Sequence, residues 1–305
     1  MDKDSKNTID SSVTRNRLKF AAWLTFFVLC IEVVGGILAN SLALLSDAAH
    51  MFTDVFSLTL SWFALKIACL PTNEEKTYGY HRIEILAAVV NGLVLALMAC
   101  AIFYEAIQRY QSPPTVDSGM VILVAALGLT TNLIVLYYLK DPFRHTHDLN
   151  LRGAFFHILG DTIASVGVLI GGGIIWLTGW FVVDPILAVG IALLLLWGAW
   201  NVLADALHIL LEGVPKGVSI AEVKKELTAL PAIRDIHELH VWSICSNIYA
   251  LSTHALLHDS KVNQFESVLK DIQELLKNRF NITHSTIQFE TRPCEKNDTL
   301  CDIRH

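Results

Sequence analysis

The sequence predicts an α-helical membrane protein with six transmembrane helices, followed by a small α/β domain in the cytoplasm. Two observations predict the membrane part: 53% of the 305 residues are hydrophobic against 17% charged, and the apolar residues gather in long runs. A third observation predicts the second domain. After Gly213 polar residues become frequent, and short alternating and helical apolar patterns replace the long runs.

Six apolar runs are long enough to cross a hydrocarbon core, which takes about 20 helical residues. They are residues 18–39, 42–70, 83–107, 120–139, 153–178 and 181–211. Positive charges gather before the first run, between the second and third, and between the fourth and fifth: Arg15, Arg17, Lys19, Lys76, Arg82, Lys140, Arg144 and Arg152. Because positively charged segments remain in the cytoplasm, we expect this side to be cytoplasmic and to hold both termini.

The residues after Gly213 predict a two-layer domain. A helix is expected over 219–230, where Ser219 and Glu222 form a capping box. A strand, a second strand, a helix and a last strand are expected at 233–243, 248–258, 262–280 and 285–290. The order α-β-β-α-β is typical of a ferredoxin-like domain with helices on one face of a sheet. The expected divisions are an N-terminal segment, a membrane domain, a cytoplasmic domain and a tail, at 1–17, 18–212, 213–291 and 292–305.

Two pairs of ionisable residues stand inside the predicted spans. His50 and Asp54 lie four residues apart in the second run, and His157 and Asp161 repeat this spacing in the fifth. On a helix such a pair shares one face, about 6 Å apart along the axis. An ionisable group inside a span costs on the order of 3 kcal/mol, so four of them indicate function more than interhelical hydrogen bonding. Two imidazoles and two carboxylates form a tetrahedral set suited to Zn²⁺.

Other ionisable residues near these spans permit two interpretations each. Asp47 shares the face of His50, and it either assists the metal or caps a local turn. Glu32 in the first run either carries a proton or makes a structural hydrogen bond. Three histidines of the predicted cytoplasmic loops either bind zinc loosely ahead of the pore or are simply solvated: His81, His145 and His147.

The paired motifs and several further stretches resemble the cation diffusion facilitator family of zinc transporters. These stretches are Ser41–His50, Tyr78–Ala88, Asp184-Pro185 and His237–Trp242, and the resemblance covers about residues 18–290. It implies a homodimer that exchanges metal for protons, similar to bacterial zinc exporters and vesicular zinc transporters, and a location in the bacterial inner membrane. Some relatives carry Asp or Asn where His50 stands, and the His form implies a preference for zinc over cadmium.

The resemblance also implies zinc sites in the cytoplasmic domain. His237, His254 and Glu290 are the first candidates, and the possible additional ligands are His284, Cys294 and Cys301. The two cysteines would complete a site across the dimer, or take no part in it. Strand alternation places His237 and His240 on opposite faces. Gln288 stands where some relatives carry Asp or His, so we expect one metal at each site.

The ligand set of the membrane motifs predicts proton-coupled metal transport. Two carboxylates and two neutral imidazoles cancel the charge of Zn²⁺, whereas the empty site is dianionic and would take up protons. Two other functions are open. An intramembrane zinc hydrolase needs a free metal position and a Glu base, as in HExxH, and neither motif contains a Glu. A metal sensor would bind Zn²⁺ in the cytoplasmic domain without moving it. We expect a transporter rather than an enzyme, with the lipid bilayer, protons and a second copy of itself as partners and no nucleic acid.

Overall fold

A computed structural model describes residues 23–145, 149–246, 248–258 and 265–292, with the side chains of 138–145 and 149–157 left out of the description. The chain forms two compact units. One comprises Met1–Thr59 and Asn91–Asn201, and the other comprises Leu60–Val90 and Val202–His305. Three long helices, α2, α3 and α6, contribute residues to both units.

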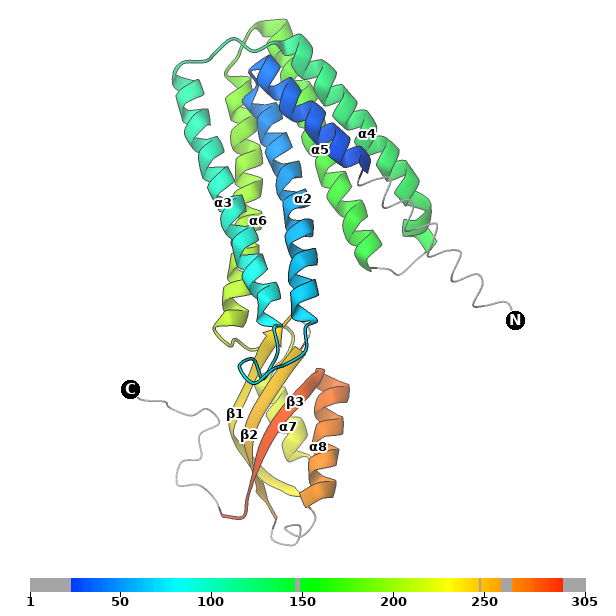
Figure 1. Cartoon of the computed structure of the whole chain (residues 1–305), viewed down its shortest axis with the longest axis vertical. Coiled ribbons are helices and arrows are strands. Elements are labelled where there is room, and N and C mark those ends of the chain that lie inside the picture. The colour runs from blue at the N-terminus through cyan, green and yellow to red at the C-terminus, as the bar shows by residue number, and fades with distance from the viewer. Residues whose placement is uncertain (1–22, 146–148, 247, 259–264, 293–305) are drawn as a thin grey trace, which may run out of the picture. The chain divides into compact units, whose positions relative to one another are not determined.

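Within the described part of the chain, five helices are long and apolar enough to cross a membrane. They are α2 (Leu42–Ala68), α3 (Arg82–Gln111), α4 (Ser118–His145), α5 (Leu149–Thr178) and α6 (Val183–Leu210), drawn in Figure 1. A shorter apolar helix, Trp23–Ala39, precedes them. The first predicted run begins at Leu18, and residues 18–22 lie outside the described part of the chain. The second to sixth predicted runs are therefore helices of spanning length, while the span predicted for the first run stays a prediction.

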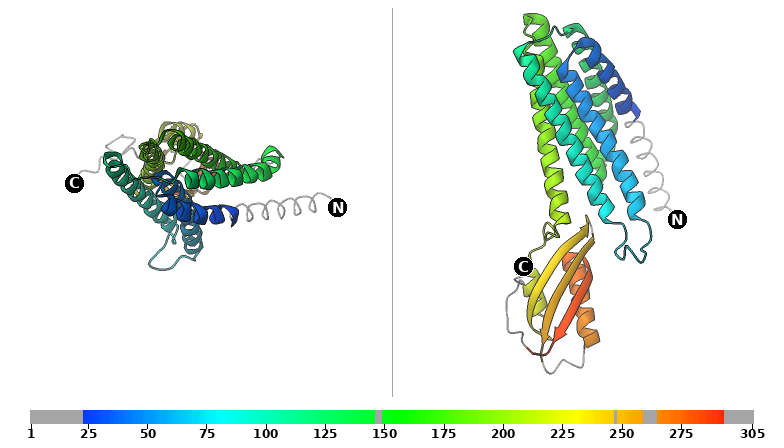
Figure 2. Two further views of the ribbon diagram at one scale, coloured as in Figure 1. Left: turned by 90° about the horizontal axis from the view of Figure 1, so that it is seen from above. Right: turned by 60° about the vertical axis from the view of Figure 1, so that its left-hand side comes forward.

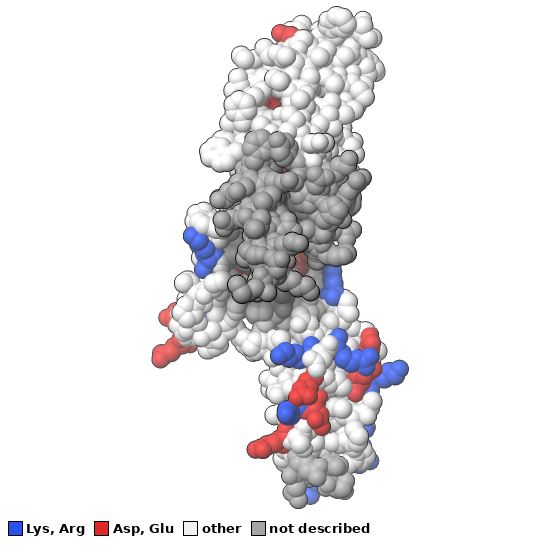
Figure 3. Space-filling view, turned by 90° about the vertical axis from the view of Figure 1, so that its right-hand side faces the viewer, with Lys and Arg blue, Asp and Glu red and all other residues white. Residues whose placement is uncertain are grey.

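The outer surfaces of these helices are apolar. Large side chains such as Leu97, Tyr137 and Trp197 are about 70% exposed, as expected for groups that face lipid rather than water. Where the face drawn in Figure 3 is not grey, charged side chains are sparse over the helices and gather over the C-terminal domain. This distribution fits an integral membrane protein with a water-exposed domain.

Small residues bring the helices of the first unit close together. Ala43, Ala188 and Ala192 are almost fully buried in its core, and α4 and α5 run side by side along it (Figures 1 and 2). A side chain on Gly35 would place its Cβ 2.5 Å from a methyl carbon of Val124, so a larger residue would force Val124 to shift. Without a hydrophobic effect between helices in lipid, such close packing is what holds a membrane bundle together.

The start of α2 is held by a carboxylate from α6. Asp184, which is 2% exposed, accepts hydrogen bonds from Ser41 Oγ at 2.6 Å and from the backbone nitrogens of Leu42 and Ala43 at 2.7 and 3.2 Å. Arg109 of α3 lies 4.0 Å from the same carboxylate. Asp184 therefore serves as the N-terminal cap of α2, although it stands in another helix. The cap fixes the beginning of the helix that carries His50.

The C-terminal domain has the predicted order of elements. They are α7 (Ile220–Thr228), β1 (Ile233–Cys245), β2 (Ile248–Leu257), α8 (Phe265–Phe280) and β3 (Ile282–Glu290). The three strands pair in the order β1-β2-β3, the first pair antiparallel and the second parallel. Helices α7 and α8 pack through Leu227 and Leu276 on one face of this sheet (Figure 2). As predicted, the Ser219 hydroxyl caps α7 by accepting from the Glu222 amide.

A β-bulge interrupts β1 beside the predicted histidines. His237 pairs with His254 and His240 pairs with Ser252, so Glu238 and Leu239 together face Thr253 alone. Glu238 has a φ of 48°, which costs a residue with a Cβ about 1–2 kcal/mol. The extra residue shifts the alternation, so His237 and His240 share a face. The expectation that they lie on opposite faces is therefore wrong.

Candidate metal sites

Three of the four predicted membrane ligands meet between α2 and α5. His50 Nε2 lies 3.6 Å from Asp161 Oδ1, and His50 Nδ1 lies 4.0 Å from Asp54 Oδ2. Two atoms bound at about 2.05 Å in tetrahedral geometry lie roughly 3.3 Å apart. The three side chains are thus slightly more open than a closed zinc site. The Asp161 side chain is 11% exposed, while His50 and Asp54 are about one-third exposed.

The fourth predicted ligand is His157, whose side chain lies outside the described residues. Its backbone is part of α5, one helical turn before Asp161. Residues four apart share one face of a helix, so His157 and Asp161 are on the same side of α5. The structure therefore brings together His50, Asp54 and Asp161, and it leaves the contribution of His157 as a prediction.

Two further carboxylates are buried in the first unit. Glu32 is 1% and Asp47 is 4% exposed. Among the described residues, Glu32 Oε2 has no hydrogen-bond partner. A Cβ at position 128 would lie 2.7 Å from Glu32 Oε1, so Gly128 makes room for this side chain. Burial of a carboxylate oxygen without a partner is costly, which favours the interpretation of Glu32 as a group that carries a proton over that of a structural hydrogen bond.

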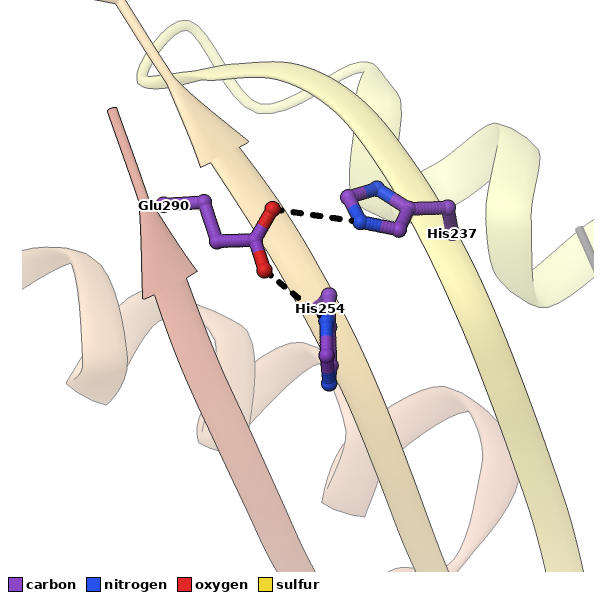
Figure 4. A group of neighbouring side chains, drawn as sticks. All are labelled: His237, His254 and Glu290. Atoms are coloured by element: carbon purple, nitrogen blue, oxygen red, sulfur yellow. Dashed lines mark ion pairs between the residues drawn. The ribbon is translucent and has the colours of Figure 1, made fainter. Parts of the chain in front are cut away.

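A second group of ligand-type side chains lies on the C-terminal sheet. His237, His254 and Glu290 come from β1, β2 and β3, and their ligand atoms all lie within 4.8 Å of one another (Figure 4). His237 Nε2 is 3.2 Å from Glu290 Oε2, and His254 Nδ1 is 2.9 Å from Glu290 Oε1. The register explains this meeting, since His237 faces His254 and β2 runs beside β3 up to Leu256 and Glu290.

The chemistry of this second group fits a divalent cation. His237 Nε2 and His254 Nδ1 are buried, yet neither contact with Glu290 has the geometry of a hydrogen bond. Buried polar atoms are nearly always bonded, and a cation between the three groups would satisfy both nitrogens. Gln288 Nε2 donates to Glu290 Oε1 at 3.0 Å and so orients the carboxylate. The nitrogen-to-oxygen distances are close to those between two ligands of one zinc ion.

Of the other candidates in the cytoplasmic domain, His284 is among the described residues, and the structure does not bring it to this group. His284 is exposed, pairs with Ala250 four residues before His254 along β2, and lies edge-on to the ring of Tyr78. At about 3.3 Å per residue, it is roughly 13 Å from the register position of His254. Cys294 and Cys301 lie outside the described residues, and so does His147. The His145 side chain is likewise not described, and His81 is half-buried.

Sequence reasoning missed Glu238, which lies beside the group formed by His237, His254 and Glu290. Glu238 Oε2 lies 3.4 Å from His254 Nε2, on the side of the ring away from Glu290. In a regular strand residue 238 would point to the face opposite His237. Only the bulge brings it to His254, and glutamate is not a residue that signals a bulge or a positive φ.

A bundle of apolar helices with a histidine–carboxylate cluster, joined to a sheet with a second cluster, defines a multi-pass membrane protein built to handle metal cations. The family model "Cation efflux transmembrane domain" matches residues 18–211, and "Cation efflux protein, cytoplasmic domain" matches residues 215–292. The chain belongs to the cation efflux family. It is a metal-cation transporter and not an enzyme.

Individual relatives match over nearly the whole chain. The metal cation efflux system protein CzcD of Cupriavidus metallidurans is 44% identical, over 92% of this chain and 88% of that protein. The cadmium, cobalt and zinc/H(+)-K(+) antiporter of Bacillus subtilis is 40% identical, over 86% and 84%. The zinc transporter ZitB of Escherichia coli is 38% identical, over 92% and 89%. All three relatives are cation transporters.

Proposed function

We propose that this protein exports Zn²⁺ from the cytoplasm in exchange for protons, through a site formed by His50, Asp54, His157 and Asp161. The observation that carries the proposal is the 3.6 Å approach of His50 on α2 to Asp161 on α5, both inside membrane-spanning helices. Residues so far apart in the sequence meet here because two apolar helices bring their few ionisable side chains to one place.

The charge of the ligand set supports coupling to protons. Two carboxylates and two neutral imidazoles balance one dication, so the loaded site is neutral in the membrane. After release the two negative charges remain, and protons are the ions that imidazole and carboxylate groups bind in place of a metal. Each state of the cycle is then close to neutral, which is what passage through lipid requires. The names of two relatives, a zinc transporter and a zinc/H(+)-K(+) antiporter, support the same assignment.

Topology and assembly complete the proposal. Six spans would place both termini in the cytoplasm of a bacterium, with domain boundaries at 1–17, 18–212, 213–291 and 292–305. The family model that matches residues 215–292 is named for a dimer, which supports a homodimer held in part by this domain. In the same domain His237, His254 and Glu290 would hold a second, structural or regulatory Zn²⁺. Cys294 and Cys301 are further candidate ligands.

Purified protein in lipid vesicles tests the proposal directly. With an acidic lumen and external Zn²⁺, we expect zinc to accumulate inside while the lumen becomes alkaline, because each entering ion displaces protons. A zinc-sensitive dye and a pH-sensitive dye inside the vesicles measure both fluxes. If the protein binds Zn²⁺ but the vesicles neither take up zinc nor lose protons, the proposal that it exchanges zinc for protons is wrong.

His50→Asp is expected to shift metal preference toward cadmium. The substitution removes an imidazole, a ligand that suits Zn²⁺, and creates the Asp that some relatives carry where the His form implies a preference for zinc over cadmium. We expect the ratio of cadmium to zinc uptake in vesicles to rise roughly tenfold, equivalent to about 1.4 kcal/mol. His258→Asp, at an exposed histidine just after β2, is the matched control and should leave the ratio unchanged. An unaltered ratio in His50→Asp would exclude His50 as a selectivity determinant.

A further inference from the structure

Glu238 adopts a backbone conformation that its own side chain does not favour. Its φ of 48° lies in the left-handed region, where glycine is at ease and asparagine is tolerated, and it lies within a strand rather than in a turn. Residues held in such conformations cluster where the surrounding structure requires them, often at ligand sites. Glu238 is directly beside such a site, because His237 precedes it.

The conformation gives the Glu238 carboxylate access to His254. Without the bulge, residue 238 would face Thr253 and point toward the side of the sheet covered by α7 and α8. With the bulge, Leu239 takes that direction and enters the core at 0% exposure. The Glu238 carboxylate lies instead 3.4 Å from His254 Nε2, on the face of the histidines.

His254 is consequently flanked by two carboxylates, one at each ring nitrogen. Nδ1 lies 2.9 Å from Glu290 Oε1 and Nε2 lies 3.4 Å from Glu238 Oε2. A neutral imidazole carries one N–H, so it can donate to only one of them. If Nε2 donates to Glu238, the lone pair of Nδ1 faces the oxygen of Glu290. Two acceptors face one another there, an arrangement that a cation between them stabilises.

We propose that Glu238 is a positioning residue that holds His254 in the tautomer with Nε2–H and so presents Nδ1 as the metal-binding atom. The inference rests on the proposed cytoplasmic metal site, and not on transport through the membrane site. A histidine that binds metal through one nitrogen commonly donates the other N–H to a carboxylate, and loss of that partner lowers metal affinity about 10–100-fold. The unfavourable φ of Glu238 persists because it brings this carboxylate into place.

The test uses the full-length protein in detergent with Asp161→Asn in every sample, so that the membrane site contributes little to metal binding. Zn²⁺ affinity is measured by competition with a chelating dye, and Co²⁺ absorption reports ligand geometry. Glu238→Gly removes both the carboxylate and the unfavourable φ. We expect it to lower Zn²⁺ affinity about 10–100-fold while the metal-free melting temperature stays level or rises. A residue with a purely structural role would not move these two quantities in opposite directions.

Two further variants complete the design. Asn281→Gly relieves a φ of 56° at an exposed position between α8 and β3, and we expect it to leave Zn²⁺ affinity unchanged. Glu238→Gln keeps an acceptor oxygen for the His254 N–H and should restore most of the affinity and the parental Co²⁺ spectrum. Parental affinity in Glu238→Gly would overturn the proposal.

A separate comparison distinguishes failure of the metal site from failure of the positioning role. If His254→Ala does not weaken Zn²⁺ binding, the cytoplasmic group holds no metal, and both the site and the role of Glu238 are refuted. If His254→Ala weakens binding and Glu238→Gly does not, the site stands and only the positioning role is refuted. Neither outcome bears on whether the protein transports zinc through the membrane site, which the vesicle experiment tests separately.

Discussion

Asp161→Asn is expected to abolish zinc uptake by vesicles. Asparagine has nearly the same shape as aspartate, but it removes one of the two negative charges of the proposed site. Bound Zn²⁺ would then leave a net positive charge within the membrane, at a cost on the order of 3 kcal/mol. That cost corresponds to a loss of roughly a hundredfold in metal binding. The measurement is the initial rate of zinc accumulation at an external concentration that saturates the parent protein.

The control for this substitution removes a carboxylate elsewhere. Asp205 is 56% exposed and pairs with Lys216 at 2.5 Å, so Asp205→Asn also removes one negative charge but leaves the proposed site untouched. We expect parental uptake from it. Elution as a single species in detergent and unchanged Zn²⁺ binding by the cytoplasmic group would show that Asp161→Asn is folded. Uptake by Asp161→Asn at the parental rate would show that zinc does not pass through this site.

The long helices could be predicted from hydropathy, but their ends could not. The fourth predicted run ends at Leu139, whereas α4 continues to His145 through Lys140 and Arg144. Hydropathy marks where lipid contact stops, while a helix continues as long as backbone hydrogen bonding and local propensity permit. The role of Asp184 could not be predicted either. Its position in the sequence suggests a residue of α6, and only the fold shows that it caps α2.

The candidate sites were predictable only in part, because spacing along the sequence does not specify the contacts between elements. A four-residue spacing places His50 and Asp54 on one helix face, but it does not say which helix that face meets. The same spacing at His157 and Asp161 suggested the fifth span as its partner, and the contact between His50 and Asp161 agrees with this pairing. In the C-terminal domain, simple alternation failed at the bulge because Glu238 has no sequence feature that predicts a left-handed conformation. His284 lies away from the group because strand register, which the sequence does not specify, pairs it with Ala250.

Asp184→Ala is expected to destabilise the membrane domain more strongly than the loss of an exposed helix cap. The buried carboxylate accepts from Ser41 Oγ and from the backbone nitrogens of Leu42 and Ala43, and Arg109 lies within ion-pair distance. Removing it leaves these donors buried without an acceptor, and breaking such a buried charged group costs about 3–5 kcal/mol. At about 2–4 °C per kcal/mol for a domain of this size, the melting temperature in detergent should fall by roughly 10 °C.

Asp117→Ala separates this effect from the ordinary loss of a helix cap. Asp117 precedes α4, and its Oδ1 accepts from the Met120 amide at 3.1 Å, but the contact is exposed to solvent. Such a cap contributes about 1 kcal/mol, so we expect a fall of only a few degrees. Asp184→Asn retains one acceptor oxygen and should lie between the two. Because Asp184 holds the beginning of α2 rather than the metal, protein that stays folded should still bind Zn²⁺ at the proposed membrane site. A melting temperature for Asp184→Ala no lower than that of Asp117→Ala would mean that the start of α2 is held by packing and not by this carboxylate.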